Sequence, residues 1–208
     1  MINVKFLILL ITLIISSILS LYIYSEESKK EKNFQSDKNI EVLNRGEDRI
    51  TLKPGYEKIG TLQARKVESW IRETPSSSMR VAQYKLDYMK GNGQLAVFSG
   101  IGGSPDENIE RWYKQFKPES NLPIGETSSK WEIVKDKFKI KFVHFEGTFM
   151  KSDMRMNSVI EELKDYALLA AIISGANEPY YFKMTGPSSL IKSQKKVFES
   201  FIKSIDKL

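Results

Sequence analysis

Residues 166–185, YALLAAIISGANEPYYFKMT, decide the fold class of this chain. The first part, Tyr166–Ser174, is almost wholly apolar, which fits either a strand buried on both faces or a buried helix continuing from Ser158. Its short length favours the strand, and the turn residues Gly175–Pro179 then lead into a clear strand at Tyr180–Thr185. We therefore predict two successive strands and a fold that is built on a sheet.

Alternating apolar and polar residues predict further strands upstream of this stretch. Between residues 79 and 88, Ala82, Tyr84 and Leu86 share one face by the period of two that a strand imposes. Residues 94–99, QLAVFS, are apolar on both faces, which is typical of a central strand. The predicted strands are Gly60–Val67, Met79–Tyr88, Gln94–Ser99 and a hairpin of Trp131–Val134 with Phe138–Phe145 around Lys135-Asp136-Lys137.

Two amphipathic helices complete the predicted domain. Ser104-Pro105-Asp106-Glu107 supplies an N-cap hydroxyl, a proline at the first helical position and a glutamate at the third, which form a capping box. Apolar residues then recur at helical spacing up to Phe116, and Pro118 is expected to end the helix. A final helix is predicted from about Pro187 to Asp206, with an apolar stripe of Leu190, Ile191, Gln194, Phe198, Phe201, Ile202 and Ile205. The sum is an α+β fold, an antiparallel sheet flanked by helices as in an αβα sandwich.

The N-terminal segment has the pattern of a membrane anchor. Phe6–Ser25 contains no charged residue, and as a helix it spans ~30 Å, the thickness of the hydrocarbon core of a bilayer. A cleaved signal peptide is the alternative, but cuts after Ser20 or Ser25 would place an isoleucine where the cleavage site needs a small residue. We predict an uncleaved anchor in residues 1–25, a flexible polar tether in residues 26–49 and a single α+β domain in residues 50–208.

The domain is expected to lie outside the cytoplasm, in the periplasm or at the cell surface. Lys5 and the α-amino group favour a cytoplasmic N-terminus, whereas the lysines after the span favour the opposite orientation. Long domains cross the membrane largely regardless of flanking charge, and this decides the prediction. Thr12, Ser16 and Ser20 fall on one helical face, where the anchors of two copies could pack closely; hydroxyl residues simply tolerated in an apolar span are the alternative.

Composition excludes several classes of function. The 208 residues carry a net charge of +6 and a pI near 9.2, but acidic residues interleave with the lysines, whereas nucleic-acid binders gather their cations into patches. The absence of cysteine removes thiolate nucleophiles, Cys-ligated metals and N-terminal cysteine lipidation. His144 is the only histidine, so a histidine-rich metal site is impossible. We therefore expect no nucleic-acid partner, no metal and no cofactor.

Several stretches resemble a group of exported or lipid-anchored bacterial proteins of unassigned function, over roughly residues 60–206. They are Ser78–Tyr84, Gly102-Gly103-Ser104 with Asn108–Phe116, Phe145–Thr148 and Tyr180–Pro187. The ending at Phe201-Ile202-Lys203-Ser204 also resembles PsbP/DcrB-like domains, which implies an accessory or binding module rather than an enzyme. Two features depart from the group: a membrane helix stands where its members often carry a lipidated cysteine, and residues 150–166 are particular to this chain.

A glycine-rich loop precedes the first predicted helix. Gly100-Ile101-Gly102-Gly103 lies between a strand and a helix, where a phosphate-binding loop would lie, but the dinucleotide pattern fails at Pro105. Asp106 and Glu107 at the helix N-terminus would also repel an anion. The sequence therefore favours a capping turn over a nucleotide site.

Ser104 and His144 are the candidates for hydrolase chemistry. Gly102–Asp106 is a near miss for the nucleophile elbow, with Ser104 as the nucleophile and His144 as its base. A helix cap explains Ser104 better, and His144, which shares a strand face with Phe142 and Glu146, is better explained as a half-buried histidine bonded to a neighbour.

A row of lysines follows the predicted hairpin. Its members are Lys135, Lys137, Lys139 and Lys141. A solvated row that protects a sheet edge is one interpretation, and docking on anionic lipid headgroups near the anchor is the alternative.

Arg80 is the strongest candidate for a ligand-binding residue. Counting by twos places it on the face of Ala82 and Tyr84, where its guanidinium needs a carboxylate or a bound ligand. Arg111 and Lys183 are weaker companions. A structural ion pair is the alternative to an anion-binding site.

The leading hypothesis is a membrane-tethered, extracytoplasmic binding or accessory domain without catalytic activity, which acts through an envelope protein partner or a small ligand. It rests on the missing catalytic constellations, the tether and the PsbP-like resemblance. A hydrolase that uses Ser104 and His144, or carboxylates, is the second hypothesis. A structural component that assembles through the Thr12, Ser16 and Ser20 face is the third. The sequence names neither the ligand nor the oligomeric state.

Overall fold

A computed structural model describes residues 17, 19–22, 24–27, 51–87, 91–153 and 158–208. The chain divides into two units, Met1–Ile50 and Thr51–Leu208. The described residues of the first unit are helical, and no helix in the described part of the chain is long and apolar enough to cross a membrane. Most of the predicted anchor and tether, with Thr12 and Ser16, lie outside the described residues, so the anchor, the tether and the packing stripe stay predictions.

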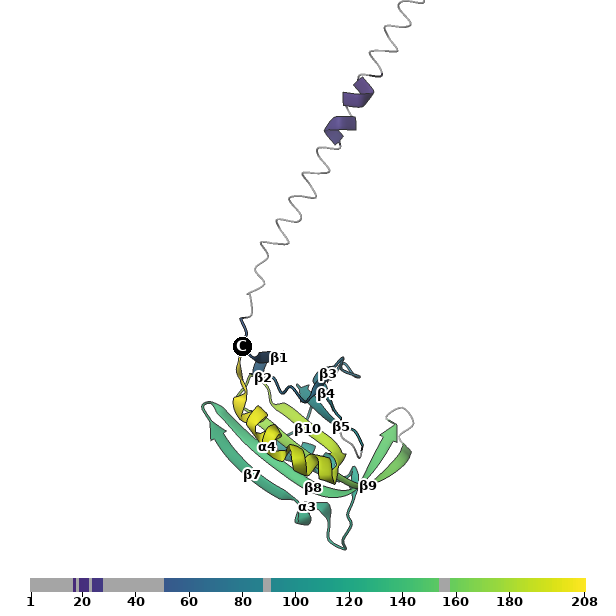
Figure 1. The fold of residues 1–208 in the computed structure, drawn as a ribbon, viewed down its shortest axis with the longest axis vertical. Coiled ribbons are helices and arrows are strands. Elements are labelled where there is room, and N and C mark those ends of the chain that lie inside the picture. Colours follow the sequence, from purple (N-terminus) through teal and green to yellow (C-terminus); the bar gives the residue numbers. More distant parts are fainter. Residues whose placement is uncertain (1–16, 18, 23, 28–50, 88–90, 154–157) are drawn as a thin grey trace, which may run out of the picture. The chain divides into compact units, whose positions relative to one another are not determined.

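An antiparallel sheet of eight strands is the frame of the second unit (Figure 1). Its strand order is β3-β4-β5-β10-β9-β8-β6, and β7 pairs with β8 outside this path. The strands are β3 (Ile71–Glu73), β4 (Arg80–Leu86), β5 (Gly93–Ser99), β6 (Phe116–Lys117), β7 (Ser129–Lys135), β8 (Phe138–Asp153), β9 (Ser158–Ser174) and β10 (Tyr180–Pro187). The predicted α+β fold with an antiparallel sheet is confirmed, and so is the predicted hairpin, which β7 and β8 form.

The stretch that decides the fold forms two strands, as predicted. β9 and β10 pair from Tyr180 opposite Ile173 to Pro187 opposite Tyr166. All residues from 167 to 173 are at most 1% exposed, which explains why no polar residue interrupts them. Gly175 ends β9 with a φ of +101°, and a Cβ at this position would lie 2.1 Å from the Lys137 carbonyl oxygen, so the turn requires glycine. β9 is longer than predicted, because it begins at Ser158.

Helices cover both faces of the sheet. α4 (Ser188–Ser204) packs on one face, and α2 (Pro105–Tyr113) with α3 (Ile124–Thr127) packs on the other. We call these the α4 face and the α2 face. The alternation of β9 supplies both cores, since Leu169 joins the core of the α4 face and Leu168 joins that of the α2 face. The buried residues of α4 are Leu190, Ile191, Phe198, Phe201 and Ile202, which all belong to the predicted stripe.

The strand predicted at Gly60–Val67 is a hairpin. β1 (Tyr56–Ile59) and β2 (Leu62–Arg65) pair across a turn at Gly60, whose φ is +62°. A Cβ at Gly60 would lie 2.5 Å from the Tyr180 hydroxyl oxygen. The prediction was wrong about the first half of the segment, because the turn depends on this long-range contact with β10.

The helix predicted to reach Pro118 is shorter. α2 ends at Tyr113, and Phe116 pairs with Phe149 as part of β6. The Phe116 ring lies 5.0 Å, centroid to centroid, from both the Phe145 and the Phe149 rings. Burial against these aromatic rings of β8 outweighs the local helical pattern.

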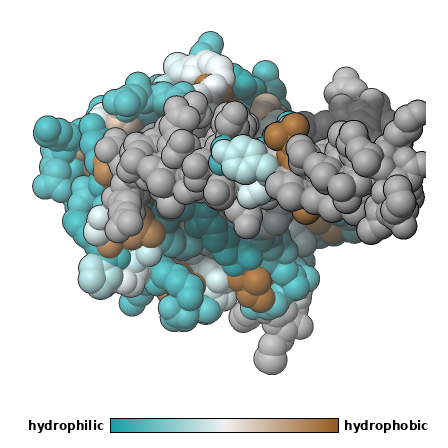
Figure 2. All heavy atoms as spheres, turned by 90° about the horizontal axis from the view of Figure 1, so that it is seen from above, coloured by the Kyte–Doolittle hydropathy of each residue, from teal (hydrophilic) through white to brown (hydrophobic). Residues whose placement is uncertain are grey.

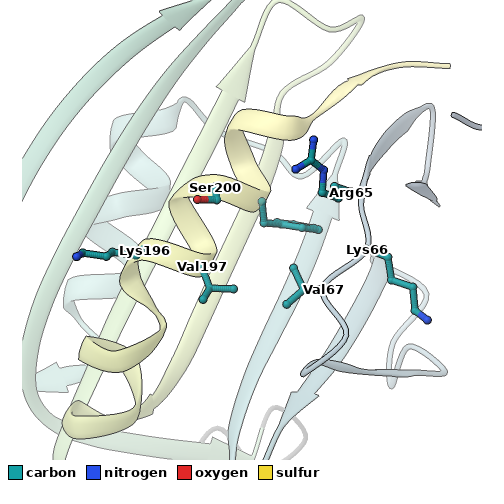
Figure 3. Close-up of a pocket in the computed structure, with 7 residues that line it drawn as sticks. Arg65, Lys66, Val67, Lys196, Val197 and Ser200 are labelled. Carbon is teal, nitrogen blue, oxygen red and sulfur yellow. The ribbon is translucent and has the colours of Figure 1, made fainter. Parts of the chain in front are cut away.

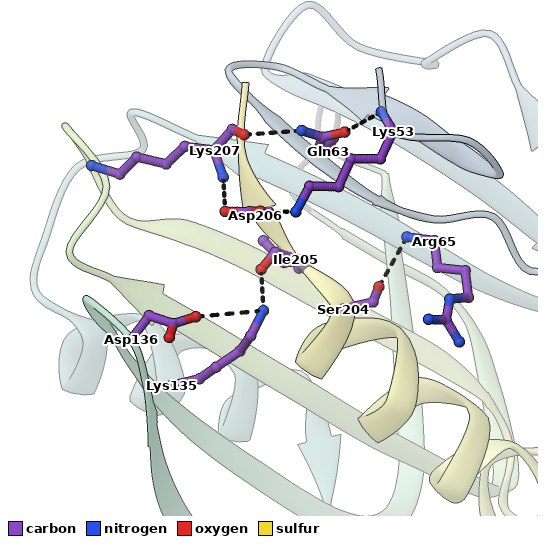
Figure 4. A network of polar contacts seen from close by, with 9 residues as sticks. All are labelled: Lys53, Gln63, Arg65, Lys135, Asp136, Ser204, Ile205, Asp206 and Lys207. Atoms are coloured by element: carbon purple, nitrogen blue, oxygen red, sulfur yellow. Dashed lines mark hydrogen bonds and ion pairs between the residues drawn. The ribbon is translucent and has the colours of Figure 1, made fainter. Parts of the chain in front are cut away.

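A small second sheet, β1-β2-β11, joins the start of this unit to its end. β11 (Asp206–Lys207) pairs with β2. Lys53 forms an ion pair with Asp206, and its backbone N–H donates to the Gln63 side chain at 2.9 Å (Figure 4). Lys135 of β7 donates to the Ile205 carbonyl at 2.8 Å, which links the small sheet to the large one.

Exposed hydrophobic side chains are scattered. On the face that Figure 2 shows, they form small separate patches among hydrophilic residues. In the described part of the second unit, the large exposed hydrophobic residues are Ile71, Met79, Leu122, Val134, Ile160 and Leu208. Single exposed apolar residues are normal on a protein surface and do not by themselves mark a binding site.

Candidate functional site

A pocket of about 570 Å³ lies on the α2 face, between α2 and the start of β4. Phe98 of β5 and Lys183 of β10 line it from the sheet, and Trp112 lines it from α2. The glycine-rich loop after β5 closes one end. The three predicted ligand residues, Arg80, Arg111 and Lys183, all line this pocket, and none of the described residues that line it is an aspartate or glutamate.

Lys183 is a lysine in the middle of the sheet. Its neighbours across the two adjacent strands are Ala96 of β5 and Ala170 of β9. Because both neighbours are small, open space remains around the lysine side chain. The Lys183 ammonium donates to the Gln115 side-chain oxygen and lies 5.9 Å from the centre of the Phe149 ring.

The charge of Lys183 is poorly compensated. Burial, with a smaller contribution from the positive charge of Arg80, lowers the pKa of Lys183 to about 8. No carboxylate of the described residues forms an ion pair with this lysine. A cation held in this way favours a bound anion.

Arg80 lies on the face opposite to the one predicted. Arg80 pairs with Phe98, whereas Ala82 pairs with Val97, so one extra residue lies between them on β4. This β-bulge turns Val81 toward the α4 face, where it packs against the core. Counting by twos fails across a bulge, and Arg80 therefore joins Lys183 on the α2 face.

The Arg80 guanidinium is held by neutral groups. Its Nη1 donates to the side-chain oxygens of Gln83 at 2.6 Å and of Gln94 at 2.9 Å, and the group lies 5.8 Å from the centre of the Phe98 ring. Burial lowers the pKa of the half-buried guanidinium. With the carboxylates that the structure describes, Arg80 does not form the direct ion pair that was the alternative to an anion-binding site. Gln83 lies between Arg80 and a carboxylate, because its side-chain oxygen accepts from Arg80 and its amide nitrogen donates to Glu73 at 2.9 Å. The Nε and Nη2 edge of Arg80 makes no hydrogen bond among the described residues, and this is the edge that grips an oxyanion with two parallel bonds.

Arg111 lies at the rim. It is exposed, and its Nη2 donates to the Gly102 carbonyl at 2.8 Å. Asn108 donates to three carbonyls of the same loop, those of Gly102, Gly103 and Ser104. The loop therefore presents its carbonyl oxygens to side-chain donors of α2, which is not the arrangement of a phosphate-binding loop.

Sequence reasoning selected the cationic members of the site and missed the neutral ones. The residue types Arg and Lys on predicted strand faces were the signal that found Arg80 and Lys183. Gln94 and Gln115 were missed because a glutamine in a strand or after a helix carries no pattern of its own. Their roles appear only when β4, β5 and α2 are assembled.

Ser99 carries the one buried side-chain polar atom without a hydrogen-bond partner in the described part of the chain. Although Ser99 lines the pocket, it pairs with Tyr180, whose side chain belongs to the core of the α4 face. Its hydroxyl therefore points away from the α2 face, and we do not count it among the ligand groups.

The structure does not favour the hydrolase hypothesis. Ser104 Oγ accepts the N–H of Glu107 at 3.2 Å and Glu107 accepts the N–H of Ser104 at 2.7 Å, which is the predicted capping box. His144 lies on the α4 face, where burial lowers its pKa; the negative charge of Glu146 opposes this shift, and the positive charge of Lys195 of α4 adds to it. The sheet separates the serine from the histidine. Among the described residues no cluster of three or more His, Asp or Glu side chains is placed to hold a metal ion.

Part of the lysine row is paired rather than free. Lys141 forms an ion pair with Asp106 at 2.8 Å, and Lys139 forms one with Glu132 at 3.1 Å. Lys135 donates to a backbone carbonyl, as described above. The pairs weaken the alternative of lipid docking by this row, because their charge is already compensated.

A second hollow, of about 300 Å³, lies between α4 and the chain that follows β2. Val67 and Val197 face each other across it, whereas Lys66 and Lys196 point away from it (Figure 3). Its floor is apolar and its cations do not converge, so it lacks the polar groups that would orient a small ligand. The pocket at Lys183 has such groups, and we regard it as the candidate site.

Comparison with known proteins adds a likeness of fold. No family model matches the chain, and no curated protein matches it. Among solved structures the chain is similar to the solution structure of cyanobacterial PsbP (CyanoP) from Synechocystis sp. PCC 6803, with 9% sequence identity over 71% of this chain and 87% of that chain and a TM-score of 0.44. The likeness does not extend to function. The resemblance to exported or lipid-anchored bacterial proteins stays a prediction.

Proposed function

We propose that the second unit is a binding module without catalytic activity, which captures a small anionic ligand in the pocket at Lys183. The observation that carries the proposal is the pair formed by Lys183 and Arg80. These are two cations on one face of the sheet, in a pocket whose described lining residues include no aspartate or glutamate.

Holding two cations together in this pocket costs free energy. Taking a cation out of water is unfavourable unless an anion or several hydrogen bonds compensate it. Among the described residues, Lys183 has one side-chain acceptor, Gln115, and Arg80 uses only Nη1 in its two side-chain bonds. An oxyanion in the pocket would accept further hydrogen bonds from Lys183 and from Arg80. A binding site therefore explains the arrangement better than a structural role does.

The lining residues support binding rather than catalysis. A hydrolytic site needs a nucleophile within hydrogen-bond reach of a base. The amide side chains here, Asn108 and Gln115, are engaged as hydrogen-bond partners of the loop and of Lys183. The chemistry available in the pocket is the recognition of charge.

The cellular setting is part of the same proposal. The uncharged stretch Phe6–Ser25 supports an anchor in the membrane, and the polar residues after it support a tether. We infer that the module works outside the cytoplasm beside the bilayer, as an accessory component of an envelope partner or as a receptor for a small ligand.

The experiment is a titration of the full chain, reconstituted in nanodiscs, with acetate and with inorganic phosphate by calorimetry. We expect saturable binding of at least one anion, and a loss of affinity of at least tenfold in Lys183→Met. Lys192→Met is the matched control, because Lys192 is exposed on α4 on the other side of the sheet. Unchanged binding in Lys183→Met, or no binding of any anion, would overturn the proposal.

A further inference from the structure

The pocket is larger than an inorganic anion. Its volume is about 570 Å³, and pockets of roughly 300–1,000 Å³ hold organic ligands and bury most of their surface. The ligand groups of Lys183 and Arg80 occupy one part of this space. The inference that follows rests on the proposed function and concerns the rest of the ligand.

The remaining lining is apolar. Phe98, Ile101 and Trp112 present rings and methyl groups to the pocket, and Met79 adds a flexible thioether that is 53% exposed. Trp112 is held in place, since its ring packs edge-on against Tyr181 with 6.4 Å between centroids. A rigid aromatic wall beside an adaptable methionine suits a flat or chain-like apolar group.

The donors suit one carboxylate. Lys183 supplies an ammonium, and the Nε and Nη2 edge of Arg80, which makes no hydrogen bond among the described residues, is a fork that matches the two oxygens of a carboxylate. A phosphate would profit from a cradle of backbone amides at a helix N-terminus. At α2 this cradle is closed, because Ser104 and Glu107 cap each other and the Glu107 carboxylate occupies that end.

We propose that the pocket binds an organic carboxylate with an apolar body: the carboxylate meets Lys183 and Arg80, and the body packs against Trp112 and Phe98. The ligand class is thus an amphipathic monoanion such as an arylacetic acid. The two cations give the pocket its preference for a carboxylate, and the aromatic side chains give it its preference for a ligand with an apolar body.

Four small probes test the proposal on the full chain in nanodiscs, with empty nanodiscs as the blank for partitioning. Phenylacetate carries both features, phenylacetamide lacks the charge, acetate lacks the body, and benzylphosphonate exchanges the headgroup. We expect phenylacetate to bind at least tenfold more tightly than each of the other three. Met79→Ser, at an exposed position, should weaken phenylacetate about threefold and leave acetate unchanged.

Each other outcome has a defined meaning. Tighter binding of benzylphosphonate, or equal binding of acetate and phenylacetate, would overturn this inference while the proposed anion site stands. Binding of phenylacetamide as tight as that of phenylacetate would overturn both, as would a lack of binding by all four probes.

Discussion

Lys183 of β10 and Arg80 of β4 lie on the same face of the sheet, and the positive charge of Arg80 adds to the burial that lowers the pKa of Lys183 to about 8. β5 runs between the two strands and contributes Ala96 next to Lys183. The two cations are brought together by a β-bulge, not by the plain alternation of a strand.

The first prediction concerns pH. Anion binding needs the charged form of Lys183, so affinity should be constant between about pH 6 and pH 7.5 and should fall as the pH rises above 8, up to about tenfold per pH unit. The other charged groups of the described residues near the pocket are Arg80, Arg111, Glu73, Glu107 and Glu178. Calorimetric titration with phenylacetate from pH 6 to 9.5 measures the change. An affinity that stays level above pH 8 would contradict it, and Lys183→Met should show no such fall.

The second prediction concerns the free energy of unfolding. The pKa of Lys183 is lower in the folded chain than the ordinary value of 10.5. Below pH 8 the folded state therefore carries the full penalty of a buried charge, and between pH 8 and 10.5 the unfolded state binds more protons, so this group makes stability rise with pH. Lys183→Met should stabilise the chain by about 2 kcal/mol at pH 7. Urea unfolding against Lys192→Met checks this, and a less stable Lys183→Met would refute it.

The third prediction separates the helix cap from catalysis. Ser104→Ala removes the hydroxyl that accepts the Glu107 N–H and should cost about 1 kcal/mol of stability. Anion binding should stay within a factor of two, because Ser104 does not line the pocket. Thermal unfolding and calorimetry measure the two effects. Strong loss of ligand binding with unchanged stability would show that Ser104 acts on a ligand.

The fourth prediction concerns the turn after β9. Gly175→Ala should cost about 3 kcal/mol, because the residue has a φ of +101° and its Cβ would lie 2.1 Å from the Lys137 carbonyl oxygen. Gly102→Ala is the control for stability, since a Cβ there would meet no atom within 4 Å. Denaturant unfolding of both variants gives the comparison, and equal midpoints would contradict the account of this turn.

The fold was predictable where local pattern and burial agree. The apolar run that became β9 has no polar residue because both of its faces are covered, and the capping box of α2 is written in four consecutive residues. The site was predictable only in part. The prediction placed Arg80 on the face of Ala82, and this was wrong, because the insertion of Val81 leaves no mark in the alternation of apolar and polar residues.

Long-range contacts account for the other differences. Phe116 continues the helical pattern of the sequence, yet it lies outside the helix because its ring packs against the rings of Phe145 and Phe149. The turn at Gly60 depends on the hydroxyl of Tyr180, which lies far along the chain. Such contacts belong to the assembled sheet and are absent from any window of sequence.

The small sheet has a practical consequence for the architecture of the second unit. The backbone N–H of Leu208, the last residue of the second unit, donates to the Thr61 carbonyl at 3.2 Å, and Lys53, near the start of this unit, forms an ion pair with Asp206. The first and last residues of this unit therefore lie close together. A short loop can join residue 51 to residue 208 and new ends can be opened at an exposed turn, so circular permutants of this unit should keep their native sheet order.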